Sequence, residues 1–111
     1  MRVMEFASDV GLEFDDGQNT FRIGPKWADL QIGDTLALHE LGKGKIGEAV
    51  VVGVVTGPYW QLLRRHCVNN HGVTVLDKRT AVEIVDSILR PLYPQLEEDT
   101  LAVAVYLRRT S

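Results

Sequence analysis

The sequence has little of what marks secreted, membrane-spanning or disulfide-stabilised proteins. It contains one cysteine, Cys67, so no disulfide can form within the chain, which fits a reducing compartment. The first 14 residues carry charges at Glu5 and Asp9 and lack the apolar run of a signal peptide. The longest apolar run, residues 49–55, is far shorter than the roughly 20 residues of a membrane-spanning helix. We therefore expect a soluble, cytoplasmic protein with no membrane partner.

An excess of positive charge is also missing. The chain has 12 Lys and Arg against 15 Asp and Glu, which gives a net charge of −3 and a pI near 5.5. Strong, non-specific binding to duplex DNA needs many phosphate contacts and is not expected. A local basic groove for a short single strand or one nucleotide remains compatible with this charge. The length of 111 residues, with 45% hydrophobic residues, fits one globular domain over residues 1–111.

Alternating and apolar patterns predict about five strands. Gly53 interrupts the valine-rich run of residues 47–56, which predicts a strand that is buried on both faces and carries a bulge or bend. The last strand should place Leu101, Val103, Val105 and Leu107 on one face. The predicted strands cover residues 2–6, 20–23, 35–41, 47–56 and 100–107.

Two helices are predicted between the fourth and the last strand, and a short helical turn over residues 26–30 follows Pro25. Gly57-Pro58 should start a helix over residues 59–66. Thr80 and Glu83 have the spacing of a capping box and predict the start of the second helix, which Pro91 and Pro94 should end. The apolar stripe of this helix comprises Ala81, Val82, Ile84, Val85, Ile88, Leu89 and Leu92.

These elements predict an α+β fold. Neighbouring strands joined by short turns imply mostly antiparallel pairing. Because closing such a sheet removes its exposed edges, we expect a small β-barrel of five or six strands with two inserted helices.

The motifs and their order resemble the ASCH family, a branch of the PUA-like barrels. The resemblance rests on Thr20-Phe21-Arg22, Gly33-Asp34-Thr35-Leu36, the strand at 47–55, and the segment 66–94 with its Leu-Tyr-Pro, followed by the closing strand. It implies a cleft between the barrel wall and the helices that binds RNA or a nucleotide-like ligand, without a cofactor.

Some ASCH members remove an acetyl group from N4-acetylcytidine, and these depend on a lysine, a threonine and a glutamate. By this resemblance Thr20 matches the threonine, and is the only catalytic candidate that matches. The lysine position holds Gly17 and the glutamate position holds Asn70. Glycine offers no amine and asparagine is no general base, so the amidohydrolase reaction is not expected unless Lys26 or Glu48 supplies the missing group.

Arg22 and Lys26 are candidate ligand-binding residues, each with a structural alternative. A planar guanidinium suits a phosphate or a base edge, but Arg22 could equally pair with Asp34 or Glu48 at the barrel rim. Lys26 stands beside Trp27, a pairing that suits a stacked base and its phosphate. Since large aromatic residues mostly serve cores, we favour Trp27 as a plug of the barrel bottom.

The start of the helix at 59–66 supplies further candidates. One of Tyr59 and Trp60 should pack while the other is exposed, and Trp60 with Arg64 could form the second wall of the cleft. A solvated helix face explains Arg64 and Arg65 equally well.

No metal site is expected. His39, His66 and His71 lack the spacing of a helical ligand pair, and Cys67 is most simply a buried, inert thiol.

The sequence thus predicts an ASCH-like domain that binds RNA or a nucleotide-type ligand, with its oligomeric state open. The alternatives are a small hydrolase acting on a modified nucleoside, a ribonuclease, or a protein-interaction module. The predicted ligand-binding residues are Thr20, Arg22, Lys26, Trp60, Arg64 and Asn70.

Overall fold

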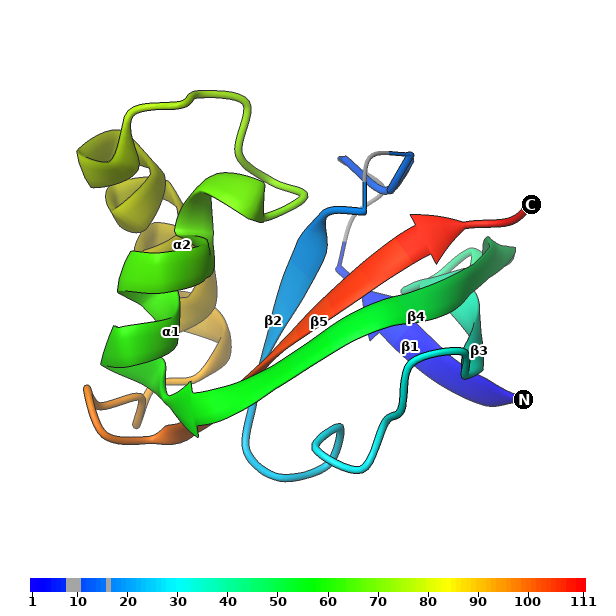
Figure 1. The fold of residues 1–111 in the computed structure, drawn as a ribbon, viewed down its shortest axis with the longest axis horizontal. Coiled ribbons are helices and arrows are strands. Elements are labelled where there is room, and N and C mark those ends of the chain that lie inside the picture. The colour runs from blue at the N-terminus through cyan, green and yellow to red at the C-terminus, as the bar shows by residue number, and fades with distance from the viewer. Residues whose placement is uncertain (8–10, 16) are drawn as a thin grey trace.

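The computed structural model describes residues 1–7, 11–15 and 17–111. A curled five-stranded sheet lies on one side and two helices lie on the other, with both termini at the end of the sheet that is far from the helices (Figure 1). The elements are β1 (Arg2–Phe6), β2 (Asn19–Ile23), β3 (Thr35–Glu40), β4 (Gly44–Pro58), α1 (Tyr59–His66), the 3-10 turn η1 (Cys67–Asn69), α2 (Lys78–Leu92) and β5 (Leu101–Arg109).

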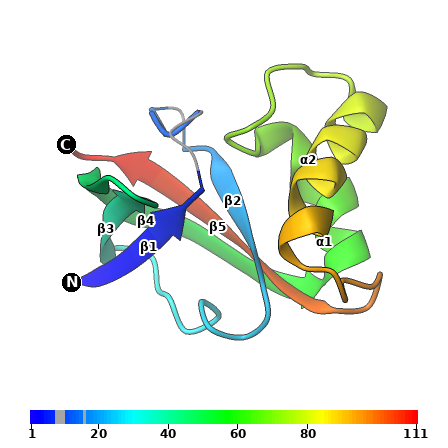
Figure 2. The ribbon, with the colours of Figure 1, turned by 180° about the vertical axis from the view of Figure 1, so that it is seen from behind.

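The sheet has the order β1-β3-β4-β5-β2 and confirms the predicted α+β class. Three of its pairings are antiparallel, and β1 pairs with β3 in parallel. The two edge strands, β1 and β2, lie near each other on the side shown in Figure 2 because the sheet curls. Arg22 of β2 reaches across this opening and donates a hydrogen bond to the carbonyl of Glu5 at 2.8 Å. The strands thus form a half-barrel, and the Arg22 side chain bridges its open side.

Strand β4 contains the predicted irregularity but differs from the prediction in burial. Its register with β5 shifts between Val51 and Gly53, as a β-bulge requires. Only Ala49 and Val51 are buried in this strand, so burial on both faces was wrong. The outer face is covered by helices at one end only, which leaves the other valines partly exposed. The strand also begins at Gly44, three residues before the predicted start at residue 47.

Helix α2 begins two residues before the predicted capping box. Asp77 is the N-cap, and its Oδ2 accepts from the backbone N and the Oγ1 of Thr80 at 3.2 and 2.6 Å. Pro91 lies inside the helix, because a proline this close to the end removes only one helical hydrogen bond. Of the predicted stripe, Ile88 and Leu92 are 47% and 55% exposed, although Leu89 between them is buried.

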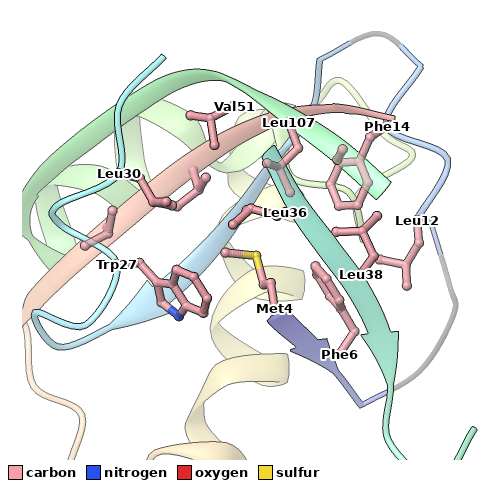
Figure 3. Close-up of a cluster of buried hydrophobic side chains, with 13 residues drawn as sticks. Met4, Phe6, Leu12, Phe14, Trp27, Leu30, Leu36, Leu38, Val51 and Leu107 are labelled. Carbon is pink, nitrogen blue, oxygen red and sulfur yellow. The ribbon is translucent and has the colours of Figure 1, made fainter. Parts of the chain in front are cut away.

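The first hydrophobic cluster fills the half-barrel. Trp27 and Leu30 come from the segment where a short helical turn was predicted, and they point into the barrel beside Met4 and Leu36 (Figure 3). Trp27 is 6% exposed and therefore closes the barrel bottom, as favoured above. The other members are Phe6, Leu12, Phe14, Leu38, Ala49, Val51, Val103, Val105 and Leu107.

The second cluster lies between the sheet and the helices. Strand β5 serves both clusters, because Val103, Val105 and Leu107 face the barrel while Ala102 and Ala104 face the helices. The helix-side members are small, which lets the helices approach the sheet. Leu101, predicted to face the barrel with the others, is 42% exposed at the strand end. In the described part of the chain, no helix is long and apolar enough to span a membrane.

Candidate functional site

A small cleft lies between the edge strands and α2. Its volume is about 140 Å³. Strands β1 and β2 form one wall, the segment after η1 closes one end, and α2 forms the opposite wall. The lining residues are Glu5, Phe6, Ala7, Thr20, Phe21, Arg22, Asn70, His71, Val85, Ile88, Leu89, Leu92 and Tyr93.

Three of the six predicted ligand-binding residues meet in this cleft. Thr20 and Arg22 come from alternate positions of β2, as the extended Thr-x-Arg pattern predicted, and Asn70 comes from the segment after η1. Thr20 is 3% exposed and Asn70 is 6% exposed, so a ligand would meet both at the base of the cleft. The extended pattern thus predicted that Thr20 and Arg22 lie on one side of β2, and their role in ligand binding stays a prediction.

Arg22 is a largely buried cation without an acidic partner among the described residues. Its Nη1 donates to the Glu5 carbonyl, and its guanidinium carbon lies 4.5 Å from the centre of the Phe6 ring. Burial lowers the pKa of Arg22 to about 10, against the opposing effects of Tyr93 and Glu5, and leaves the side chain charged at neutral pH. Its Nε has no hydrogen-bond partner in the described structure.

Neither of the predicted alternative partners of Arg22 is near it. Asp34 accepts a hydrogen bond from the backbone of Gln31 at 2.9 Å, and Glu48 pairs with Lys45 at 2.6 Å. The rim ion pair considered above is therefore absent. The guanidinium instead has a backbone carbonyl and an aromatic ring, which orient it without neutralising its charge.

Asn70 holds the end of the cleft in place. Its Nδ2 donates to Oδ1 of Asn19 at 3.3 Å, and its Oδ1 accepts from the backbone of Gly72 at 2.9 Å. Asn19 is fully buried, and its Nδ2 donates to the carbonyl of His66 at 2.9 Å. The backbone N of His71 donates to the Asn19 carbonyl at 2.9 Å. This amide network attaches the segment after η1 to β2.

The backbone at Gly17, which the resemblance matches to the lysine of the amidohydrolase-type members, does not favour a lysine. Its φ is +70°, in the left-handed region where glycine is preferred. Among described residues outside its chain neighbours, an added Cβ would have one heavy atom within 4 Å, Cγ2 of Val52 at 3.7 Å. A side chain at Gly17 would thus start toward β4, away from the cleft lining.

The two residues considered as replacements also lie outside the cleft lining. Lys26 has its Nζ 5.2 Å from the centre of the Trp27 ring, and Glu48 is paired with Lys45. Lys26 is consequently not brought together with Thr20 and Arg22.

Trp60 and Arg64 line a separate and more open groove along α1, which we call the outer groove. It has a volume of about 600 Å³. The structure brings Trp60 and Arg64 together but does not place them in the cleft. The outer groove is lined by Pro58, Trp60, Gln61, Arg64, Arg65, Lys78, Glu98 and Asp99.

No group of His, Cys, Asp and Glu side chains within residues 1–7, 11–15 and 17–111 could hold a metal ion. Cys67 is fully buried, and this burial raises the pKa of its thiol, as expected of an unreactive cysteine. Nδ1 of His66 lies 2.5 Å from the hydroxyl oxygen of Tyr106. Burial, together with the charge of Arg65, lowers the pKa of His66.

Solved structures with this arrangement of elements include ASCH proteins from two organisms. The ASCH domain of Lactobacillus crispatus JV V101 superposes with a TM-score of 0.60 at 13% identity, over 97% of this chain and 78% of that one. The ASCH protein of Zymomonas mobilis gives a TM-score of 0.58 at 17% identity, over 96% of this chain and 65% of that one. This chain has the ASCH-domain fold.

A third structure matches this chain over the full length of both proteins. The hypothetical protein PH0355 superposes with a TM-score of 0.65 at 16% identity, over 99% of this chain and 100% of that one. No family model matches the sequence, and no curated protein matches it significantly. The similarity is thus one of backbone architecture, while the side chains have diverged widely.

Sequence reasoning missed five polar or aromatic residues of the cleft, namely Glu5, Phe6, Phe21, His71 and Tyr93. The first two reach it because β1 pairs with β3 in parallel, a long-range pairing with no local signal. His71 was considered only as a metal ligand, and Tyr93 only as part of the Leu-Tyr-Pro similarity. The polar neighbour Asn19, adjacent to the recognised Thr20, gave no sign of its role.

Proposed function

We propose that this chain is an ASCH-type domain that binds a nucleoside- or nucleotide-type ligand, free or as part of RNA, in the cleft between β2 and α2. The observation that carries the proposal is Arg22, a largely buried guanidinium without an acidic partner among the described residues. A buried charge that its surroundings compensate only in part is costly, and groups in such perturbed environments cluster at functional sites. A phosphate or a base carbonyl would supply the missing acceptor.

The two walls of the cleft differ in polarity, as do the flat face and the edge of a nucleobase. One wall is apolar and comes from Val85, Ile88 and Leu89 of α2, which suits the flat face of a ring. The opposite wall offers Thr20 and Arg22, which suit its polar edge. The volume of about 140 Å³ is below the roughly 300–1,000 Å³ of drug-sized pockets, so one base is a better fit than a longer segment.

In this proposal the domain does not carry out the amidohydrolase reaction of its ASCH relatives. Gly17 has no amine, and its backbone geometry directs an added side chain toward Val52. Asn70 uses both ends of its amide in the network with Asn19 and Gly72. We also propose a cytoplasmic location, which the single buried cysteine fits, and no cofactor.

The test is an NMR titration of the labelled protein with cytidine, uridine, cytidine monophosphate and inorganic phosphate. The amide signals of Thr20, Arg22 and Asn70 should shift on addition of the nucleosides. Thr20→Val removes one hydroxyl at constant size and should weaken binding about fivefold, the equivalent of one hydrogen bond of about 1 kcal/mol. Thr35→Val, at an exposed threonine outside the cleft lining, is the matched control. A panel that shifts none of the cleft signals refutes the proposal.

A hydrolase is the second candidate, because two titratable groups, Glu5 and His71, line the same cleft as Thr20. Release of acetate from N4-acetylcytidine, abolished by Thr20→Ala, would establish this activity over simple binding. The third candidate, a protein-interaction module, would be favoured by Trp27 or Tyr59 filling the cleft. Both belong to hydrophobic clusters instead.

A further inference from the structure

The outer groove is a second surface with features of a binding site, and none of its residues lines the cleft. One side is the exposed face of α1, and the other is the segment that contains Glu98 and Asp99. The backbone N of Trp60 donates to the Glu98 carbonyl at 2.9 Å, and that of Tyr59 donates to the Thr100 carbonyl at 2.8 Å. These bonds join the two sides, so the groove has a defined shape.

The cations of the outer groove have no acidic partners within the described residues. Arg64, Arg65 and Lys78 are all exposed, and none of them takes part in the ion pairs that the structure shows. Glu98 and Asp99 line the same groove without neutralising them. These three cations form no ion pairs and outnumber the two carboxylates of the groove, which leaves a small local excess of positive charge on a chain whose net charge is −3.

An exposed indole lies within the same groove. Trp60 is 42% exposed, whereas Trp27 is 6% exposed, so the two tryptophans have separate roles. The guanidinium carbon of Arg64 lies 5.6 Å from the centre of the Trp60 ring. A ring for stacking with a cation beside it is the arrangement by which proteins hold a base next to its phosphate.

We propose that the outer groove binds single-stranded nucleic acid, with one base stacked on Trp60 and phosphates on Arg64, Arg65 and Lys78. Glu98 and Asp99 then accept hydrogen bonds from base amino groups or ribose hydroxyls. The exposed Trp60 ring favours a nucleic acid over an acidic peptide, because every base offers a flat face for stacking. Three phosphate contacts are too few to hold a duplex strongly at physiological salt.

Fluorescence anisotropy with labelled eight-nucleotide RNA and DNA of the same sequence tests this proposal. Trp60→Leu should weaken binding about tenfold, within the range for the loss of one base stack. The slope of log K against log salt should be about −2 for the wild type, and about −1.4 for Arg65→Ala, because each phosphate contact to a single strand contributes about −0.7. Arg108→Ala removes a charge from β5, outside the groove, and should keep the wild-type slope. Comparing the two oligonucleotides shows whether the ribose hydroxyl contributes.

Two results would overturn the proposal. One is an unchanged affinity in Trp60→Leu and Arg65→Ala, with folding verified by circular dichroism. The other is an acidic peptide that competes for the site with equal affinity. Because Thr20→Val alters the cleft and Trp60→Leu alters the groove, failure here is distinguishable from failure of nucleoside binding in the cleft.

Discussion

The cleft and the outer groove are built in different ways. The cleft brings together β1, β2, the segment after η1, and α2. Its residue Asn70 belongs, with Asn19, to a network of hydrogen bonds that maintains the fold. The outer groove consists of one exposed helix face and two nearby segments. Its cations have no partner within the described residues other than the Trp60 ring.

This difference predicts how far binding and stability can be separated. In the cleft, Asn19 and Asn70 join distant segments, so a substitution there changes both the fold and the site. In the outer groove, substitutions should change binding. The free energy of unfolding should stay within about 0.5 kcal/mol of the wild-type value, as is usual for surface positions. The outer groove can therefore change its sequence without loss of the fold, and the amide network beneath the cleft cannot.

The largest effect is expected at Gly11, which lies against the segment that closes the cleft. An added Cβ would lie 1.9 Å from the carbonyl oxygen of His71, and the glycine has a φ of +70°. Gly11→Ala should lower the free energy of unfolding by about 3 kcal/mol, through backbone strain and displacement of that segment. Urea denaturation measures this loss.

Gly42→Ala is the matched control for backbone conformation. Gly42 has a φ of +84°, but an added Cβ would meet nothing within 4 Å among the described residues. Gly42→Ala should lower the free energy of unfolding by about 1 kcal/mol, the lower end of the cost of a left-handed conformation in a residue other than glycine. If both substitutions cost the same, close packing against His71 is not what holds the segment.

The second prediction compares two amides, one in each region. Asn19→Ala removes a buried amide that bonds the His66 carbonyl and Asn70, and should destabilise the protein by about 2 kcal/mol. Gln61→Ala removes an exposed amide from the outer groove and should stay within about 0.5 kcal/mol of the wild type. Denaturation midpoints of the two variants give the comparison, and a neutral Asn19→Ala would contradict it.

Local sequence patterns were sufficient to predict most helices and strands, but they did not predict all residues that line the cleft. The alternation around Thr20 and Arg22 predicted that both project from one face of β2, and both line the cleft. The proline-started helix at α1 had the predicted bounds. These features depend on residues that are close in the sequence, so the sequence carries their signal.

The remaining site residues depend on contacts between distant segments. Trp60 and Arg64 were expected to face Thr20, but the rotation of α1 against the sheet turns them to a separate groove. Buried Leu62 and Leu63 fix that rotation. The parallel pairing of β1 with β3 brings Glu5 to the cleft. Neither relation can be read from the spacing of residues along the chain.

The smallest expected effect concerns pH and also belongs to the network beneath the cleft. Burial and Arg65 lower the pKa of His66 from its ordinary value of 6.5, so the folded state binds this proton less readily than the unfolded state. Stability should therefore fall as the pH drops through about 6.5 and below, and recover above it. The ring is partly exposed, so we expect this contribution to be below about 1 kcal/mol.

His66→Gln should flatten this part of the pH dependence, measured by urea denaturation between about pH 5 and 7.5. Gln61→Ala, in the outer groove, carries no titrating group and should keep the wild-type slope. Because the His66 carbonyl accepts from Asn19, acid should weaken the network that closes the cleft before it affects the outer groove. Equal slopes in His66→Gln and the wild type would mean that His66 titrates alike in the folded and unfolded states. The two regions would then differ in packing and hydrogen bonding, but not in their response to acid.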